Sequence, residues 1–165
     1  MSSLSLSLLG ELDHELSQLR KTIERIPSEQ LNFKPHPKSM TLSQLGTHLA
    51  QIPFWGAMTL TTPEVDLAQP WEQPDPKTTE EILAILDRSV SEFRAALEPA
   101  SEETMQAPWT LRKGEHVIFT MPRAQLMRGM IMNHLIHHRG QLSVYLRLLD
   151  VPVPALYGPS ADEAN

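Results

Sequence analysis

Hydrophobic residues recur every three or four positions along four stretches of the chain, which is the spacing of amphipathic helices. The first stretch covers about residues 6–26 and forms one narrow apolar stripe, typical of helix-on-helix packing. The members of this stripe are Leu9, Leu12, Leu16, Leu19, Ile23 and Ile26. The other three stretches begin near residues 41, 78 and 120, and the last runs to about residue 149. The pattern therefore predicts four helices.

Two of the predicted helices open with the sequence of a capping box, in which a Thr oxygen and the side chain three residues later satisfy free backbone N–H groups. These sequences are Thr41-Leu-Ser-Gln44 and Thr78-Thr-Glu-Glu81. In the helix that follows Thr41, Pro53 removes a backbone donor. We therefore expect a bend or break there, unless the carbonyl four residues earlier finds another partner.

The connections between the predicted helices differ in character. Residues 61–76 contain four prolines and several acids, which predicts a long connecting loop. Residues 109–120 are β-prone on both sides of Lys113-Gly114, which predicts a small β-hairpin. The sequence thus predicts an all-α fold: a four-helix bundle with a long crossover connection and a small β-hairpin before the last helix, in one domain over residues 1–165.

Charge and composition narrow the function classes. The chain has 14 Lys and Arg residues against 20 Asp and Glu residues, and its net charge of −6 argues against a nucleic-acid-binding face. It has no cysteine, which excludes a disulfide scaffold, a thiolate metal site and a cysteine nucleophile. No apolar run reaches the roughly 18 residues that a membrane span needs, and residues 1–6 lack the basic segment of a secretory signal. We therefore expect a cytoplasmic protein without membrane or nucleic-acid partners.

Three of the seven histidines have positions that suit a metal site. His134 and His138 lie four residues apart in the last predicted helix, so their rings share one face. His48, in the second predicted helix, is the candidate for a third ligand. Three neutral imidazoles that leave a position open are the ligand set of catalytic zinc sites, and imidazole favours Zn, Ni, Fe or Cu over Mg or Ca. The alternative for each ring is a hydrogen-bonded histidine of the helix core.

Other residues on the same faces are candidates for a substrate pocket. Gln141 and Tyr145 continue the stripe of the histidine pair, and Trp55 lies two turns after His48 on the same face. They could orient or enclose a substrate, or they could fill a polar seam and an apolar core. Leu135 stands where a zinc metalloprotease helix has its glutamate base, and the last predicted helix has no acid to hold a di-iron centre.

Two longer segments carry a family resemblance. One is Phe33-Lys-Pro-His-Pro-Lys-Ser-Met-Thr-Leu-Ser-Gln-Leu-Gly-Thr-His48, and the other begins His134-Leu-Ile-His-His-Arg-Gly-Gln and runs into the tail Val151-Pro-Val-Pro. They resemble the first motif and the last helix and tail of the DinB-like family. The resemblance implies a four-helix bundle that is often dimeric. It also implies a metal site formed by His48, His134 and His138.

The resemblance further implies thiol chemistry, since the family includes thiol-dependent S-transferases and a maleylpyruvate isomerase that uses low-molecular-weight thiols. Because the chain has no cysteine, the sulfur would come from a small cosubstrate. We therefore expect a divalent transition metal, Zn or Ni first and Fe next, in a homodimeric S-transferase or hydrolase that uses a thiol or water on small electrophiles. Two alternatives stay open: a non-catalytic metal- or ligand-binding stress-response protein, and a purely structural bundle.

Overall fold

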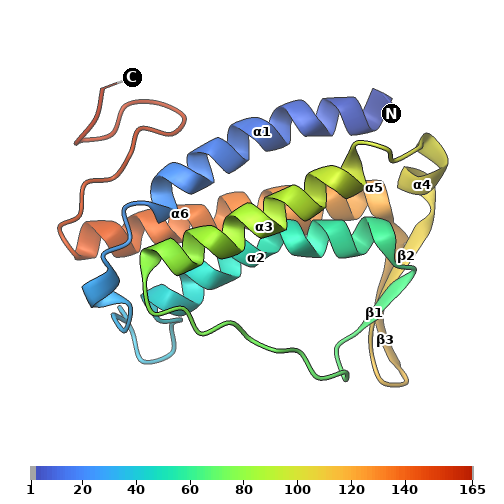
Figure 1. Cartoon of the computed structure of the whole chain (residues 1–165), viewed down its shortest axis with the longest axis horizontal. Helices are drawn as coiled ribbons and strands as arrows, with labels where there is room; N and C mark the ends of the chain where they lie inside the picture. Colours follow the sequence, from blue (N-terminus) through green and yellow to red (C-terminus); the bar gives the residue numbers. More distant parts are fainter. Residues whose placement is uncertain (1–2, 165) are drawn as a thin grey trace.

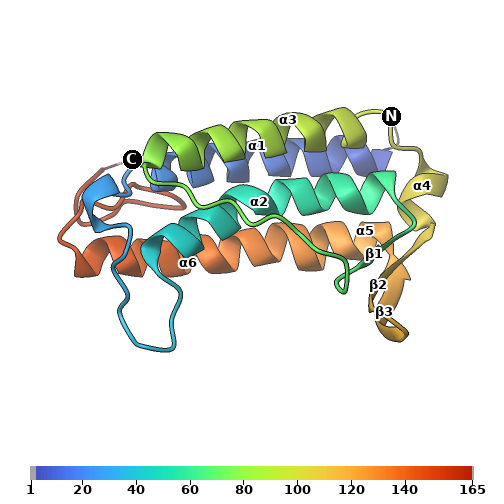
Figure 2. The same cartoon turned by 60° about the horizontal axis from the view of Figure 1, so that its bottom comes forward.

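Long helices dominate the computed structural model, which describes residues 3–164. Four long helical segments lie side by side in both views (Figures 1 and 2). They are α1 (Ser3–Ile23), α2 (Leu42–Thr61), α3 (Thr79–Leu97) and the continuous run of α5 (Arg123–Leu126), η2 (Met127–Met132) and α6 (Asn133–Leu148). The expected helical class is confirmed. Two short helices, η1 (Ser28–Gln30) and α4 (Glu102–Gln106), were not expected from the hydrophobic pattern.

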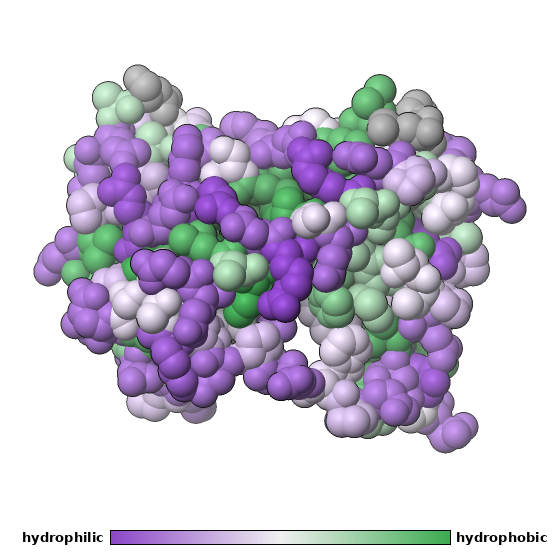
Figure 3. Space-filling model, in the orientation of Figure 1, coloured by the Kyte–Doolittle hydropathy of each residue, from purple (hydrophilic) through white to green (hydrophobic). Residues whose placement is uncertain are grey.

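The core lies between these helices, where their apolar stripes meet. All six members of the stripe predicted in the first helix are buried, and so are the leucines at positions 42, 45 and 49 of α2. Figure 3 shows a largely hydrophilic face, with hydrophobic side chains visible in patches between the helices. Within residues 3–164, no helix combines the length and the apolar character that a bilayer crossing requires.

The two predicted capping boxes form to different extents. At α2 the box is complete, because the Gln44 backbone donates to Thr41 Oγ1 at 3.1 Å and the Thr41 backbone donates to Gln44 Oε1 at 2.9 Å. At α3, Thr78 caps the Glu81 backbone at 3.2 Å, but the Glu81 carboxylate accepts from the Lys77 backbone at 2.6 Å. The second half of that box is therefore displaced by one residue. The predicted break in α2 does not occur, since this helix continues past its internal proline.

A small sheet lies at one end of the helices (Figure 1). The predicted hairpin is present as β2 (Pro108–Lys113) and β3 (His116–Pro122), which pair antiparallel. A third strand, β1 (Glu64–Asp66), pairs parallel to β2, so the prediction of a loop over residues 61–76 was wrong for these three residues. Asp66 accounts for the pairing, because it accepts from the Gly114 backbone at 2.8 Å and from the Arg112 guanidinium at 2.7 Å. The backbone N–H of Ala68, and after it that of Gly114 and the charge of Arg112, hold the pKa of Asp66 below its usual value.

The last helical run contains a stretch of wider, π-type turns at η2, directly before the histidine pair. Such turns are rare within helices and occur frequently at functional sites. The carbonyl of Met130, in this stretch, lies 3.2 Å from His134 Nδ1. The π turns therefore supply a backbone acceptor that holds the ring of His134.

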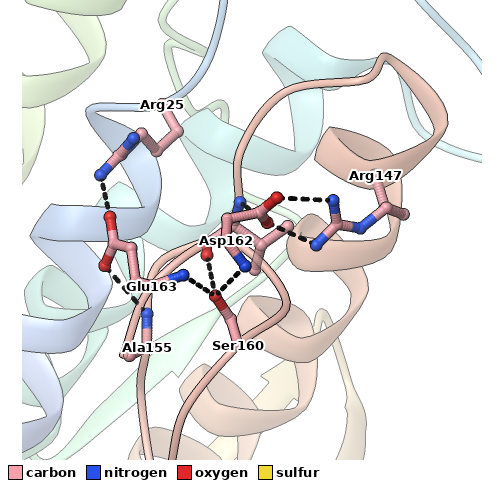
Figure 4. Close-up of polar contacts among 7 residues, drawn as sticks. Arg25, Arg147, Ala155, Ser160, Asp162 and Glu163 are labelled. Carbon is pink, nitrogen blue, oxygen red and sulfur yellow. Dashed lines mark hydrogen bonds and ion pairs between the residues drawn. The ribbon is translucent and has the colours of Figure 1, made fainter. Parts of the chain in front are cut away.

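The C-terminal tail folds back along the helices and is held by hydrogen bonds and ion pairs (Figure 4). Asp162 binds Arg147 at 2.6 Å and accepts from the Val153 backbone at 2.8 Å, while Glu163 pairs with Arg25 in the turn that follows α1. Ser160 caps this turn by donating to the Val153 carbonyl at 2.7 Å. The tail is thereby tied both to α6 and to the turn that follows α1.

A buried ion pair joins α1, α6 and the tail. Arg139 is only 1% exposed, and it binds the Glu15 carboxylate at 2.7 Å and the Glu15 backbone carbonyl at 3.0 Å. The Tyr157 hydroxyl donates to the same carboxylate at 2.7 Å. Arg139 thus faces away from the neighbouring histidines and has a structural partner of its own.

Candidate metal centre

The structure brings together three histidines from two helices that lie far apart in the sequence. His48 comes from α2, and His134 and His138 come from consecutive turns of α6. Nε2 of His134 lies 3.1 Å from Nε2 of His48 and 2.9 Å from Nε2 of His138. All three rings are half-buried, and the three could hold one metal ion. Two imidazoles that share a tetrahedral ion at about 2.0–2.1 Å each have nitrogens about 3.3 Å apart, so the observed spacing is close to that around a common ion.

The hydrogen bonds of the outer ring nitrogens determine what the inner nitrogens can do. His134 Nδ1 faces the Met130 carbonyl at 3.2 Å, and His138 Nδ1 faces the Gln141 amide oxygen at 2.7 Å. A carbonyl oxygen only accepts, so each Nδ1 carries the proton and each Nε2 keeps a lone pair. Two lone pairs 2.9 Å apart repel each other unless a cation lies between them. The donor set therefore fits a metal ion, with Met130 and Gln141 orienting the rings.

Burial and neighbouring rings keep His48 and His134 in the uncharged form that binds metals. Burial, and then the neighbouring His138 and His134, lower the pKa of His48 from 6.5 to about 4. Burial first, and then His138, also lower the pKa of His134. At neutral pH these two imidazoles are therefore neutral, and no proton has to leave before a metal binds.

A cavity of about 310 Å³ lies next to the three histidines, and His48 and His134 form part of its wall. We call it the tryptophan cavity, because Trp55, Trp71 and Trp109 all line it. The predicted pocket residue Trp55 is thus found beside the centre. Trp71 and Trp109 were missed by the sequence reasoning, since they lie on the connection after β1 and on β2, and only the folded chain brings them to α2.

The other two predicted pocket residues lie on a different side of the centre. Gln141 and Tyr145 line a separate surface cavity of about 390 Å³ together with His138. Gln141 uses its amide oxygen on His138, and its amide nitrogen donates to His137 at 3.1 Å. The Tyr145 hydroxyl donates to the carbonyl of Met40 at 3.1 Å. In this structure both polar groups are thus engaged with the protein itself.

Comparisons with known proteins agree with this architecture. A family model described as the DinB family matches residues 1–165. The chain is 26% identical over 156 residues to the uncharacterized protein YrdA of Bacillus subtilis (strain 168), an overlap of 94% of this chain and 89% of that protein.

Two solved structures share the fold. A DinB-like protein from Bacillus cereus ATCC 10987 superposes with a TM-score of 0.69 at 20% identity, over 91% of this chain and 95% of that one. The DinB-like protein YjoA from Bacillus subtilis gives a TM-score of 0.71 at 18% identity, over 90% of this chain and 96% of that one. At these identities the likeness concerns the fold alone.

Proposed function

This chain belongs to the DinB family, and from that membership and its three histidines we propose that it is a metal-dependent S-transferase or hydrolase acting on small electrophiles. The observation that carries the proposal is the convergence of three Nε2 atoms, 2.9 and 3.1 Å apart, at the wall of an apolar cavity. His48, His134 and His138 would hold a divalent transition metal, with Zn or Ni preferred and Fe next. Helices arranged as a four-helix bundle with a long crossover would provide the rigid frame.

When bound, such a metal lowers the pKa of a thiol or water at its open position, so that the nucleophilic anion exists near neutral pH. The residues of the chain orient the metal ligands and form the surroundings of the nucleophile. His134 and His138 are held in the metal-binding tautomer by their Nδ1 bonds. The apolar wall of the tryptophan cavity would limit the number of water molecules around the nucleophile.

The sulfur must come from a low-molecular-weight thiol, because the chain has no cysteine. In the transfer, a carbon–sulfur bond forms between the thiol and the electrophile while the bond from that carbon to its leaving group breaks. The thiol proton and the leaving anion pass to solvent, so the step needs no oxidant or reductant. With water as the nucleophile the same balance gives hydrolysis.

The test measures metal content and conjugation on the same samples. Wild-type protein and the variants His134→Ala and His116→Ala are analysed by mass spectrometry for metals. Each is then incubated with Zn²⁺ or Ni²⁺, a bacterial thiol and a chlorinated aromatic acceptor. His116 is the matched control, because it is an exposed histidine of β3 outside the three-histidine group.

We expect about one metal ion per chain and conjugate formation in the wild type and in His116→Ala, and neither in His134→Ala. Conjugation that survives both chelation and His134→Ala would contradict the proposal.

A second candidate is a non-catalytic metal- or ligand-binding stress-response protein. It is favoured by one observation: among the described residues that line the tryptophan cavity, the only acid is Glu72, which is exposed and not a positioned general base. Tight metal binding without turnover of any thiol and electrophile would support this candidate over the enzyme.

We also propose a homodimer. Val144 and Leu148, one turn apart on α6, are 58% and 57% exposed, and such an apolar pair on a long helix suits a partner helix. Light scattering after size exclusion, on the wild type and on the double variant Val144→Glu with Leu148→Glu, measures the mass. A monomeric wild type would contradict this assembly.

A further inference from the structure

All three tryptophans of the chain line one cavity, although they come from three separate elements. Trp55 belongs to α2, Trp109 to β2, and Trp71 to the crossover, the long connection between β1 and α3. Aromatic residues are only 5% of the chain, and the main core between the helices consists mostly of leucine, isoleucine and methionine. The cavity wall is therefore richer in aromatic side chains than the main core.

Three aromatic rings of this wall are packed on one another. The centroids of Trp55 and Trp71 are 5.2 Å apart with planes 42° apart, and Phe54 meets both rings edge-on at 6.2 and 6.1 Å. Trp71 is 37% exposed, so its ring forms the outer rim. The crossover passes across α2 in Figure 2. The contact of Trp71 with Trp55 holds this connection over the cavity.

The charge of the wall determines which ligands it can accept. Among the described residues that line the cavity, none is Lys or Arg, and the acid Glu72 is exposed to solvent. An anion would lose its hydration without gaining a charged partner. A cation would also lose its hydration, and the solvent-screened carboxylate of Glu72 would return little of that free energy, with or without a metal at the histidines. An uncharged ligand meets neither difficulty.

The volume of the cavity limits the number of aromatic rings that a bound ligand can have. An apolar cavity of about 150 Å³ holds a benzene molecule, and this cavity has about 310 Å³. It therefore has room for one or two aromatic rings with small substituents. Aromatic side chains bind such rings in stacked or edge-on arrangements that add to the burial of apolar area.

We propose that the tryptophan cavity binds an uncharged aromatic molecule of one or two rings against Trp55 and Trp71, and that this molecule is the electrophile of the centre. The first half stands on the cavity alone, whereas the second half rests on the proposed function. His48 and His134 are in the same wall, so a ring bound there lies beside the nucleophile.

The binding test uses chelator-treated protein, so that a metal cannot attract a charged probe. The probes are 4-nitrobenzyl alcohol, 4-nitrobenzoate and 4-nitrobenzylammonium, which share one ring and differ in charge. Because every tryptophan lies in the cavity wall, quenching of protein fluorescence reports binding at this site, and titration calorimetry gives the affinity. We expect the alcohol to bind at least tenfold more tightly than either charged probe. Equal affinities, or tighter binding of a charged probe, would overturn the proposal.

Variants at the rim locate the bound ring. Trp71→Ala should weaken binding of the alcohol on the order of tenfold, and Trp71→Phe should restore most of it, since stacking needs an aromatic face. Val117→Ala is the matched control, because this hairpin residue is 53% exposed and does not line the cavity. Unchanged melting temperatures show that each variant folds. Binding that is indifferent to Trp71→Ala would overturn the proposal.

The two proposals fail in different ways. If the alcohol binds as expected but no metal supports conjugation, the enzymatic function is wrong and the aromatic site stands. If conjugation proceeds equally well with charged and uncharged acceptors and ignores Trp71→Ala, the function stands and the aromatic specificity is wrong.

Discussion

Acid should destabilise the metal-free protein through His48. Burial, and then the neighbouring His138 and His134, lower the pKa of His48 from 6.5 to about 4. In the unfolded chain the ring returns to its ordinary pKa, so between these pH values the unfolded state binds a proton that the folded state does not. The contribution of this ring to stability is therefore complete above pH 6.5 and is lost as the pH falls towards 4.

The size of the effect follows from the two pKa values. The difference between 6.5 and about 4 corresponds to roughly 3 kcal/mol, at about 1.36 kcal/mol per pH unit. His48 is only half-buried, and solvent screening reduces this to about half. Of the remainder, about 1 kcal/mol is lost between pH 7 and pH 5.

The assay compares urea unfolding of chelator-treated wild type and His48→Gln at pH 7 and pH 5. The variant lacks the titrating ring but keeps the carboxylates, which also respond to pH. Its free energy of unfolding should therefore fall by about 1 kcal/mol less than that of the wild type over this range. Equal losses in the two proteins, or a larger loss in the variant, would refute the reasoning.

Two further predictions concern packing and the support of the metal ligands. In Gly56→Ala, the new Cβ would lie 2.7 Å from two ring atoms of the buried Phe93, so urea unfolding should show a loss of about 1–3 kcal/mol. Gly10→Ala is its control, since among the described residues no atom beyond its chain neighbours and the backbone of its own helix turn lies within 4 Å of the new Cβ, and it should gain about 0.5–1 kcal/mol. Gln141→Leu removes the acceptor of His138 Nδ1 and should weaken metal affinity about 10–100-fold by competitive titration; an unchanged affinity would show that this bond does not orient the ring.

The helices and their starts could be predicted because the responsible interactions are local. Apolar residues at spacings of three and four mark the buried face of a helix, and Leu12, Leu19 and Ile23 are accordingly buried. The Thr41 cap depends on groups within three residues of each other, so its sequence is sufficient. The cap at Thr78 was only half predicted, because a nearby backbone donor competes for the same carboxylate.

For the site, the i and i+4 spacing of His134 and His138 already placed two rings on one helix face. The sequence by itself thereby determined two of the three candidate ligands, together with the helical frame. Tertiary structure alone decided that His48 meets this pair, because helix packing sets which faces of α2 and α6 come together. It also decided that the crossover and the hairpin bring Trp71 and Trp109 to the same cavity. No sequence pattern near Trp71 or Trp109 predicts that they line a cavity. Side chains separated by many residues meet only through the long-range packing of the elements that hold them.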